Sequence, residues 1–228
     1  DASTIDLSGF AHYMAMPNLA AFGNAGFPFT RMADLSDSAL VMPDNASGDD
    51  VANALALLGR MGASTGYPAL RTRVIQARQV DEHADQDLLV LGSRRNQPLF
   101  ARWAAAVPVG DSAQARRFGL SDWLFNTLPA FLSPDARRTD LPTVAEVGVR
   151  PQPGDVLLLG FESPLRKGRS VVALMADEPG HVNRLFEAWF DPARLRQFQG
   201  SVVLLQGDTV RSLAGNQTYY VGELPPLL

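Results

Sequence analysis

Residues 87–92 read Asp-Leu-Leu-Val-Leu-Gly, an almost wholly apolar run that follows an acidic turn. Such a run is typical of a strand that is buried on both faces, as the strands of a parallel sheet are. Similar runs lie at 39–42, 156–161, 170–175 and 201–206. Short apolar strands that alternate with amphipathic helices indicate a layered α/β domain. We therefore expect a mostly parallel sheet with helices on both of its faces.

The best helix signals of the first half follow residue 46. Ser47 can cap a helix, and the two aspartates that come next would lie in its first turn, where the helix dipole favours acids. Val51, Leu55 and Leu58 are spaced by four and three residues, which predicts that they share one face of the helix. Gly62 is a residue at which that helix can end.

The second half of the chain contains two predicted hairpins and the clearest helix. The runs at 156–161 and 170–175 are separated by Pro164 and Gly168, which allows a hairpin, and Gly207-Asp208 is a two-residue turn before 209–213. Pro179 opens a helical pattern in which apolar residues recur at the first, fourth, fifth and eighth positions, namely Val182, Leu185, Phe186 and Trp189. Residues 219–221 are expected to form a strand that pairs at an edge of the sheet.

The first 38 residues differ from the rest, because they are rich in small residues, proline and glycine and show no alternation of strand and helix. We interpret residues 1–38 as an irregular lead-in from a preceding domain. Residues 39–228 are then the α/β domain itself.

Composition excludes several classes of function. Among the 228 residues there is no cysteine, so disulfides and cysteine-based metal or catalytic sites are impossible. The formal net charge of −4 gives no basic excess of the kind that nucleic-acid binding requires. No apolar run approaches the roughly 20 residues needed to span a bilayer. Hydrophobic residues at 46% are typical of an ordinary globular domain.

Enzyme, cofactor and metal motifs are weak. Ser112, in Gly-Asp-Ser, resembles the nucleophile of one esterase class, with His181 as a partner, but the aspartate spacing that this class uses does not match. Residues 43–47, after the first strand, carry acids that would repel the phosphate of a nucleotide or flavin. The acidic cluster at 81–87 lacks the central glycine of a calcium loop. We therefore expect no catalytic residue, cofactor or metal, and keep a serine hydrolase as the less favoured alternative.

Aromatic side chains are the candidates for stacking on sugar rings or for contact with a partner. Trp103 and Trp189 lie on apolar faces of predicted helices and are expected in the core. The remaining candidates for contact with a glucan or a partner are Tyr67, Trp123, Tyr219 and Tyr220. Among them, Tyr67, Tyr219 and Tyr220 are expected to be exposed.

Five blocks of sequence together resemble one family. They are Pro17-Asn18-Leu19-Ala20-Ala21-Phe22 with Gly26 to Leu35, then Val41-Met42-Pro43-Asp44-Asn45, Thr65-Gly66-Tyr67-Pro68-Ala69, residues 87–92, and Gly168-Arg169-Ser170-Val171-Val172-Ala173. In this order, over roughly residues 4–222, they resemble the periplasmic regulatory subunits of bacterial cellulose synthase.

The resemblance implies a fold and a function. Proteins of this family are periplasmic, alternate carbohydrate-binding β domains with flavodoxin-like domains, and end in one anchor in the inner membrane. The chain looks like the second flavodoxin-like domain, with the tail of a β domain in residues 1–38 and an anchor expected after Leu228. Its implied role is that of a non-catalytic scaffold, which binds the membrane-embedded catalytic subunit and supports the synthesis and outward passage of nascent cellulose.

Two alternatives to the scaffold stay open, a module that binds glucan or flavin and, less favoured, the serine hydrolase. The family is often named for binding cyclic di-GMP. The usual pocket for that ligand contains R-x-x-x-R, and no two arginines of this chain are four residues apart. We therefore expect cyclic di-GMP to bind the catalytic partner.

Overall fold

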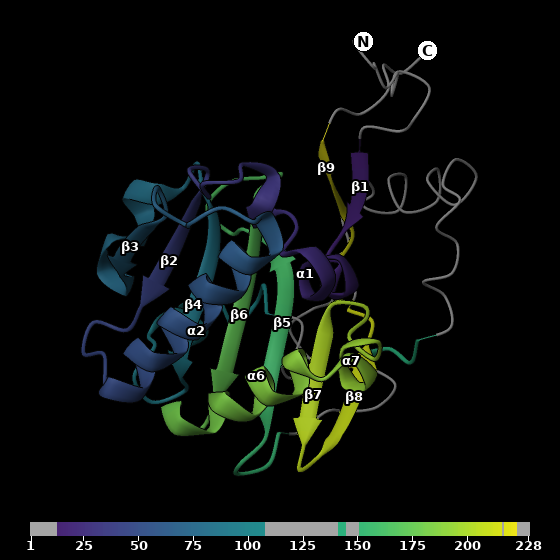
Figure 1. Ribbon diagram of the computed structural model, residues 1–228. Coiled ribbons are helices and arrows are strands. Elements are labelled where there is room, and N and C mark those ends of the chain that lie inside the picture. The colour runs from purple at the N-terminus through teal and green to yellow at the C-terminus, as the bar shows by residue number, and fades with distance from the viewer. Residues whose placement is uncertain (1–12, 108–140, 145–150, 216, 223–228) are drawn as a thin grey trace.

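The computed structural model describes residues 13–107, 141–144, 151–215 and 217–222, and within them a seven-stranded sheet occupies the centre of the molecule (Figure 1). The spatial order of its strands is β3-β2-β4-β6-β5-β7-β8. Their bounds are β2 Ser38–Met42, β3 Arg73–Gln76, β4 Asp87–Ser93, β5 Val156–Glu162, β6 Ser170–Ala176, β7 Val202–Gln206 and β8 Thr209–Leu213.

The sheet is mixed, which corrects the expectation of a mostly parallel one. Strands β3, β2, β4 and β6 are parallel, whereas β5 is antiparallel to both of its neighbours and β8 is antiparallel to β7. The connections explain this result, because a parallel pair needs a crossover of a dozen or more residues. The predicted turns at 163–169 and 207–208 are too short for one, and both are confirmed as hairpins. The order β3-β2-β4 matches the first three strands of the flavodoxin-like order, but β6, the fifth strand of the sheet along the chain, then takes the place of the fourth.

Helices and turns cover both faces of the sheet. The helices are α1 Leu19–Ala25, α2 Gly48–Thr65, α3 Leu99–Arg102, α6 Asn183–Phe190 and α7 Pro192–Leu195, with shorter 3₁₀ turns η1 Phe29–Arg31, η2 Ala77–His83 and η5 Pro179–Val182. Side chains of α1, α2 and α6 join one apolar cluster, on the side that faces the viewer in Figure 1. Side chains of η2 and α3 join a second apolar cluster, together with the strand side chains that point to the opposite face of the sheet.

The run at 87–92 is buried on both faces, as predicted. Leu89 and Leu91 belong to the cluster under α2 and α6, whereas Leu88 and Val90 belong to the cluster under α3, and all four are at most 1% exposed. Successive side chains of a strand point to opposite faces, so a strand covered on both sides has no position left for a polar residue.

Helix α2 begins where the sequence predicted. The Ser47 hydroxyl accepts the Asp50 N–H, and the Asp50 carboxylate accepts the Ser47 N–H at 2.8 Å, which is a capping box. The helix runs past Gly62 and ends at Gly66, whose φ of 66° is left-handed. Glycine adopts that conformation without the steric cost that a Cβ brings.

The buried side of α2 differs from the apolar face that the sequence suggested. The Asn53 side chain donates to Pro179 O at 2.9 Å, and Arg60 reaches Gly23 O at 3.2 Å, which orients one flank of the helix toward α1 and η5. The apolar residues that pack against the sheet are Ala54, Leu57 and Met61.

An apolar corner remains uncovered on the opposite flank of α2. Val51 and Leu55 are 49% and 67% exposed there, whereas Leu58, the third residue with the predicted spacing, packs against the buried cluster. Val74 on β3 is 59% exposed and pairs in register with Leu40, whose side chain belongs to the cluster beneath α2. We call Val51, Leu55 and Val74 the apolar corner.

The segment before β2 is more regular than expected. Residues 19–25 form helix α1, capped by the Asn18 side chain, and Phe22 packs edge-on against Phe29 and at 4.9 Å against the ring of Trp189. Leu19, Phe22 and Phe29 are at most 1% exposed, so this segment supplies part of the core. The predicted domain division at residue 38 stays a prediction, and residues 1–12 lie outside the described part.

A two-stranded ribbon holds the two ends of the described chain together. Strand β1, Tyr13–Met16, pairs antiparallel with β9, Tyr219–Gly222, as expected for an edge pair. The ribbon projects from the body of the sheet beside α1 (Figure 1). Tyr219 anchors it, because its hydroxyl bonds to Ser170 Oγ at 2.8 Å. Whatever precedes Tyr13 and follows Gly222 therefore leaves the domain at one place.

We predict that two leucines of α2, two residues apart, differ sharply in their effect on stability. Leu57→Ala should lower the free energy of unfolding by about 2–5 kcal/mol, because Leu57 is fully buried. Leu55→Ala, the matched control, should change it by no more than about 0.5 kcal/mol, because Leu55 is 67% exposed. Urea denaturation followed by tryptophan fluorescence measures both, and equal effects would contradict this assignment of the buried face.

Candidate functional site

The carboxyl ends of β2, β4 and β6 are the first place to look for a site, because ligands of open α/β sheets bind at that edge. Between β2 and β4 the edge is occupied by the protein's own groups. The Asp50 carboxylate, 1% exposed, accepts hydrogen bonds from the Ser47 hydroxyl at 2.7 Å and from Asn96 Nδ2 at 3.0 Å. Asn96 Oδ1 in turn accepts from Ser93 N and Oγ. A negative charge thus already lies at the N-terminus of α2, where a phosphate would otherwise bind.

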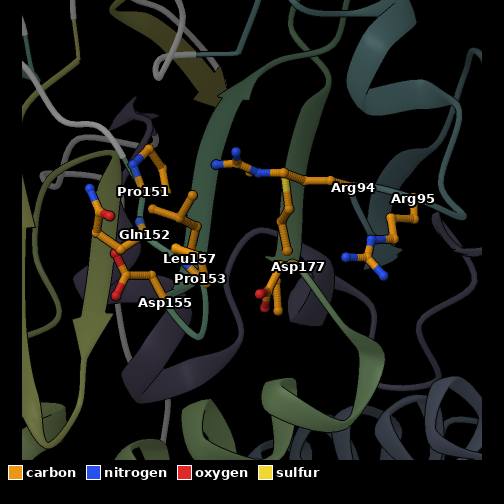
Figure 2. A pocket seen from close by; sticks show the side chains of 10 residues that line it. Arg94, Arg95, Pro151, Gln152, Pro153, Asp155, Leu157 and Asp177 are labelled. Atoms are coloured by element: carbon orange, nitrogen blue, oxygen red, sulfur yellow. Dashed lines mark hydrogen bonds between the residues drawn. The ribbon is translucent and has the colours of Figure 1, made fainter.

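A small pocket lies next to this closed edge, at the ends of β4 and β6 and the start of β5 (Figure 2). Its volume is about 220 Å³. Leu157 and Met175 line it but are only 1% and 5% exposed, and polar side chains surround them. The polar lining comes from Arg94, Arg95, Gln152, Asp155 and Asp177.

The loop at 151–155 is fixed by hydrogen bonds, so the pocket is preformed. Asp155 Oδ2 accepts from Gln152 N at 2.8 Å and from Gln206 Nε2 at 3.1 Å, and Gly154 N donates to Asp177 Oδ2 at 3.0 Å. Arg184 holds the other side of the loop through Gly154 O at 2.8 Å.

The two arginines of the pocket differ in their partners. Arg95 points away from the cavity and pairs with Glu178 at 3.2 Å, whereas Arg94 extends toward Pro151 and Leu157 (Figure 2). The Arg94 backbone N–H is held by Ala176 O at 3.0 Å. Its guanidinium has no hydrogen-bond or ion-pair partner within the described ranges.

Asp177 and His181 form a pair beside the pocket. His181 Nδ1 lies 2.8 Å from Asp177 Oδ1, and this hydrogen bond holds the pKa of the Asp177 carboxyl below its ordinary value of 3.8. The two residues are thus in contact, although their spacing in the chain is not the one that the esterase class uses. Ser112 lies outside the described residues, so no nucleophile can be placed beside the pair and the hydrolase alternative stays untested.

The acidic cluster at 81–87 is divided among separate partners. Asp81 pairs with Arg102 at 2.6 Å, and Asp85 pairs with Arg166. Asp87 is buried at the start of β4, where it accepts from Arg31 at 2.6 Å and from Ser170 N at 2.7 Å. Burial raises the pKa of Asp87, against the opposing effect of Ser170 N–H and Arg31. Within the described residues, no group of three or more histidines and acids is placed to hold a metal ion.

The aromatic candidates occupy different environments. Tyr67 is 50% exposed, as predicted, on the turn after α2. Tyr219 is buried, which contradicts its expected exposure: its hydroxyl is used to anchor β9. Tyr220 is partly buried, with its ring edge-on to Tyr13 at 5.9 Å. Trp123 lies outside the described residues, and nothing tests a role for any of the four. Trp103 and Trp189 are in the core, as predicted.

The sequence did not predict the pocket. Its residues come from three separate segments, at 94–95, 151–157 and 175–177, and no motif connects Arg94 with Asp155. A signal existed only in Pro151-Gln152-Pro153-Gly154, which marks a turn before a buried strand.

A model of the family described as cellulose synthase BcsB, second FD domain, matches residues 12–174. The chain belongs to the cellulose synthase BcsB family. It is 65% identical over 223 residues to the cyclic di-GMP-binding protein of Xanthomonas axonopodis pv. citri, covering 98% of this chain and 28% of that protein. The proteins of the same name from Pseudomonas fluorescens and Komagataeibacter xylinus are 41% and 35% identical, over 97% and 98% of this chain and 29% and 28% of theirs. The resemblance found in the sequence is thereby confirmed.

The chain spans less than a third of the length of these relatives. Membership of the BcsB family makes it part of an accessory subunit of cellulose synthase, and its relatives are named as binding proteins. In the ranges that the structure describes, no helix combines the length and the apolar character that crossing a membrane requires.

We predict that the Asp177–His181 pair makes stability depend on pH in the acid range. Because the pKa of Asp177 is lower in the folded chain, its carboxylate stabilises the fold above pH 3.8, and that contribution is lost as the pH falls through the folded-state pKa. Asp177→Asn should therefore be less stable than the native chain at pH 7, by no more than about 1 kcal/mol at this surface site, and equally stable near pH 2.

The measurement is urea denaturation at a series of pH values. His181→Ala is the matched control, because it removes the partner and should abolish most of the same difference. If Asp177→Asn differs from the native chain equally at all pH values, the pair has no role in the acid dependence.

Proposed function

We propose that the chain is a non-catalytic domain of a periplasmic subunit of cellulose synthase, which binds the membrane-embedded catalytic subunit and supports synthesis and outward translocation of β-1,4-glucan. Membership of the BcsB family is the observation that carries this proposal. The match over 98% of the chain to a longer relative supports a role as one part of a larger subunit.

The structure supports a scaffold over a nucleotide- or flavin-binding domain. At the carboxyl edge between β2 and β4, the place of the phosphate is taken by the Asp50 carboxylate with its three hydrogen bonds. Inserting an anion there would bring two negative charges together in a buried environment, which is costly. A fold that usually binds a cofactor does not by itself imply one.

Placement in the cell follows from the same proposal. The subunit is tethered to the inner membrane by an anchor that follows this domain in the longer protein. The β1–β9 ribbon supports this arrangement, because it makes the chain enter and leave the domain at one place. The anchor would thus lie close to the domain that precedes this one.

The relatives' name raises cyclic di-GMP as a ligand, and we propose that the catalytic partner binds it instead. No two arginines of the chain have the four-residue spacing of the usual pocket. Arg94 and Arg95, which are adjacent, point in different directions (Figure 2).

We propose that the apolar corner is the surface that meets the catalytic subunit. Val51, Leu55 and Val74 leave a helix flank and a sheet edge uncovered, and exposed apolar patches of this kind mark interaction sites. The complementary surface on the catalytic subunit is therefore expected to be an apolar segment.

The proposed function is tested by co-purification from cells that express the catalytic subunit. The full subunit, and this domain with its native downstream segment, should both co-purify with it and sustain glucan synthesis from UDP-glucose. Failure of the second protein, with success of the full subunit, would show that the essential contact lies in another domain.

The corner itself is tested in the full subunit with Leu55→Glu combined with Val74→Glu. We expect co-purification to fall at least about tenfold, because two charges would be buried without partners. Arg211→Glu on β8, at the opposite edge of the sheet, is the matched control and should bind normally. Normal binding by the double variant would exclude the corner.

A further inference from the structure

The pocket in Figure 2 has two polar groups whose hydrogen-bonding capacity is unused by the described residues. One is the Arg94 guanidinium, which extends toward Leu157. The other is Oδ1 of Asp155, since only Oδ2 of that carboxylate accepts hydrogen bonds. Asp155 is 8% exposed, and a carboxylate with so little access to water gains from a further donor. A ligand that offers both an acceptor and a donor would satisfy these two groups at once.

The charges of the pocket argue against an anion. Arg95 is neutralised by Glu178, so Arg94 remains as the free cation of the pocket's described lining, while Asp155 and Asp177 both contribute negative charge. The lowered pKa of Asp177 keeps that carboxyl ionised at neutral pH. A phosphate or carboxylate would therefore gain one guanidinium and face two acids. A neutral ligand avoids that repulsion.

The polar groups of the lining favour a sugar ring. Leu157 and Met175 line the pocket but are only 1% and 5% exposed, so a ligand would be held by its polar groups. Hydroxyl groups around a pyranose can both accept from an arginine and donate to a carboxylate. The volume of about 220 Å³ is small for a pocket and has room for about one such ring. The loop at 151–155 is already held in place by Arg184, so binding needs no reordering of that side.

We propose that this pocket, through Arg94 and Asp155, binds one pyranose unit of a neutral glucan. The choice of a β-1,4-glucan as the source of that unit rests on the proposed function. The described lining of the pocket contains no aromatic ring, so binding is weak, with a dissociation constant on the order of 1 mM. Weak contact of this kind lets a growing chain move past.

The test is a titration of the isotope-labelled 228-residue chain with cellotriose, followed by amide chemical shifts in NMR spectra. We expect shifts at Gly154, Asp155 and Met175, and at least about tenfold weaker binding in Arg94→Ala, because a hydrogen bond to a charged group is lost. Arg73→Ala, an exposed arginine on the edge strand β3, is the matched control and should bind as the native chain does.

Three outcomes would overturn the proposal. They are no shifts at the pocket up to the solubility of cellotriose, shifts that persist in Arg94→Ala, and tighter binding of acetate than of cellotriose, which would make the pocket an anion site. Maltotriose tests the linkage: equal binding keeps a sugar site but removes the link to β-1,4-glucan. Co-purification with the catalytic subunit is measured separately on Arg94→Ala, so failure of the pocket and failure of the scaffold role can be told apart.

Discussion

The double burial of the central strands is the constraint on which the rest of the structure depends. Because β4 and β6 are apolar on both sides, each face of the sheet needs its own cover, and the chain supplies one in α1, α2 and α6 and another in η2 and α3. Burying strands this completely also leaves their ends as the places where polar groups can gather. The two ends of β4 show this, with Asp87 at its start and Ser93 at its finish, and both are hydrogen-bonded.

The polar groups at the ends of the strands explain why a fold of this type need not bind a cofactor. In a doubly wound domain the N-terminus of the helix after the first strand is the strongest anion site available. Here the protein places its own carboxylate there, and Asp50 stabilises the helix and attaches it to Asn96 on the next loop. The positive end of the helix dipole thus serves stability. What remains for function is the surface, and that agrees with a domain whose family is an accessory part of a synthase.

Much of the fold could be predicted from the sequence, because it depends on local patterns. Apolar runs, short turns and the Ser47 cap determine strands, hairpins and the start of α2 wherever the signal lies within a few residues. The hairpins were predicted, but the mixed direction of the sheet was not. Two strands joined by a short connection must be antiparallel, and for β5 this is incompatible with a mostly parallel sheet. The exposure of Val51 and Leu55 could not be predicted, because their four-residue spacing is also that of the buried Leu57 and Met61. A contact between Asn53 and Pro179, 126 residues away, selects between the two faces.

Long-range contacts also decide what the candidate site residues do. Tyr219 was predicted to be exposed, yet its hydroxyl reaches Ser170, the residue whose N–H binds Asp87. The terminal ribbon, the start of β6 and the start of β4 are therefore joined by one buried polar chain. Such a chain resists the separation of the ribbon from the sheet, since breaking any bond in it leaves a buried group unsatisfied.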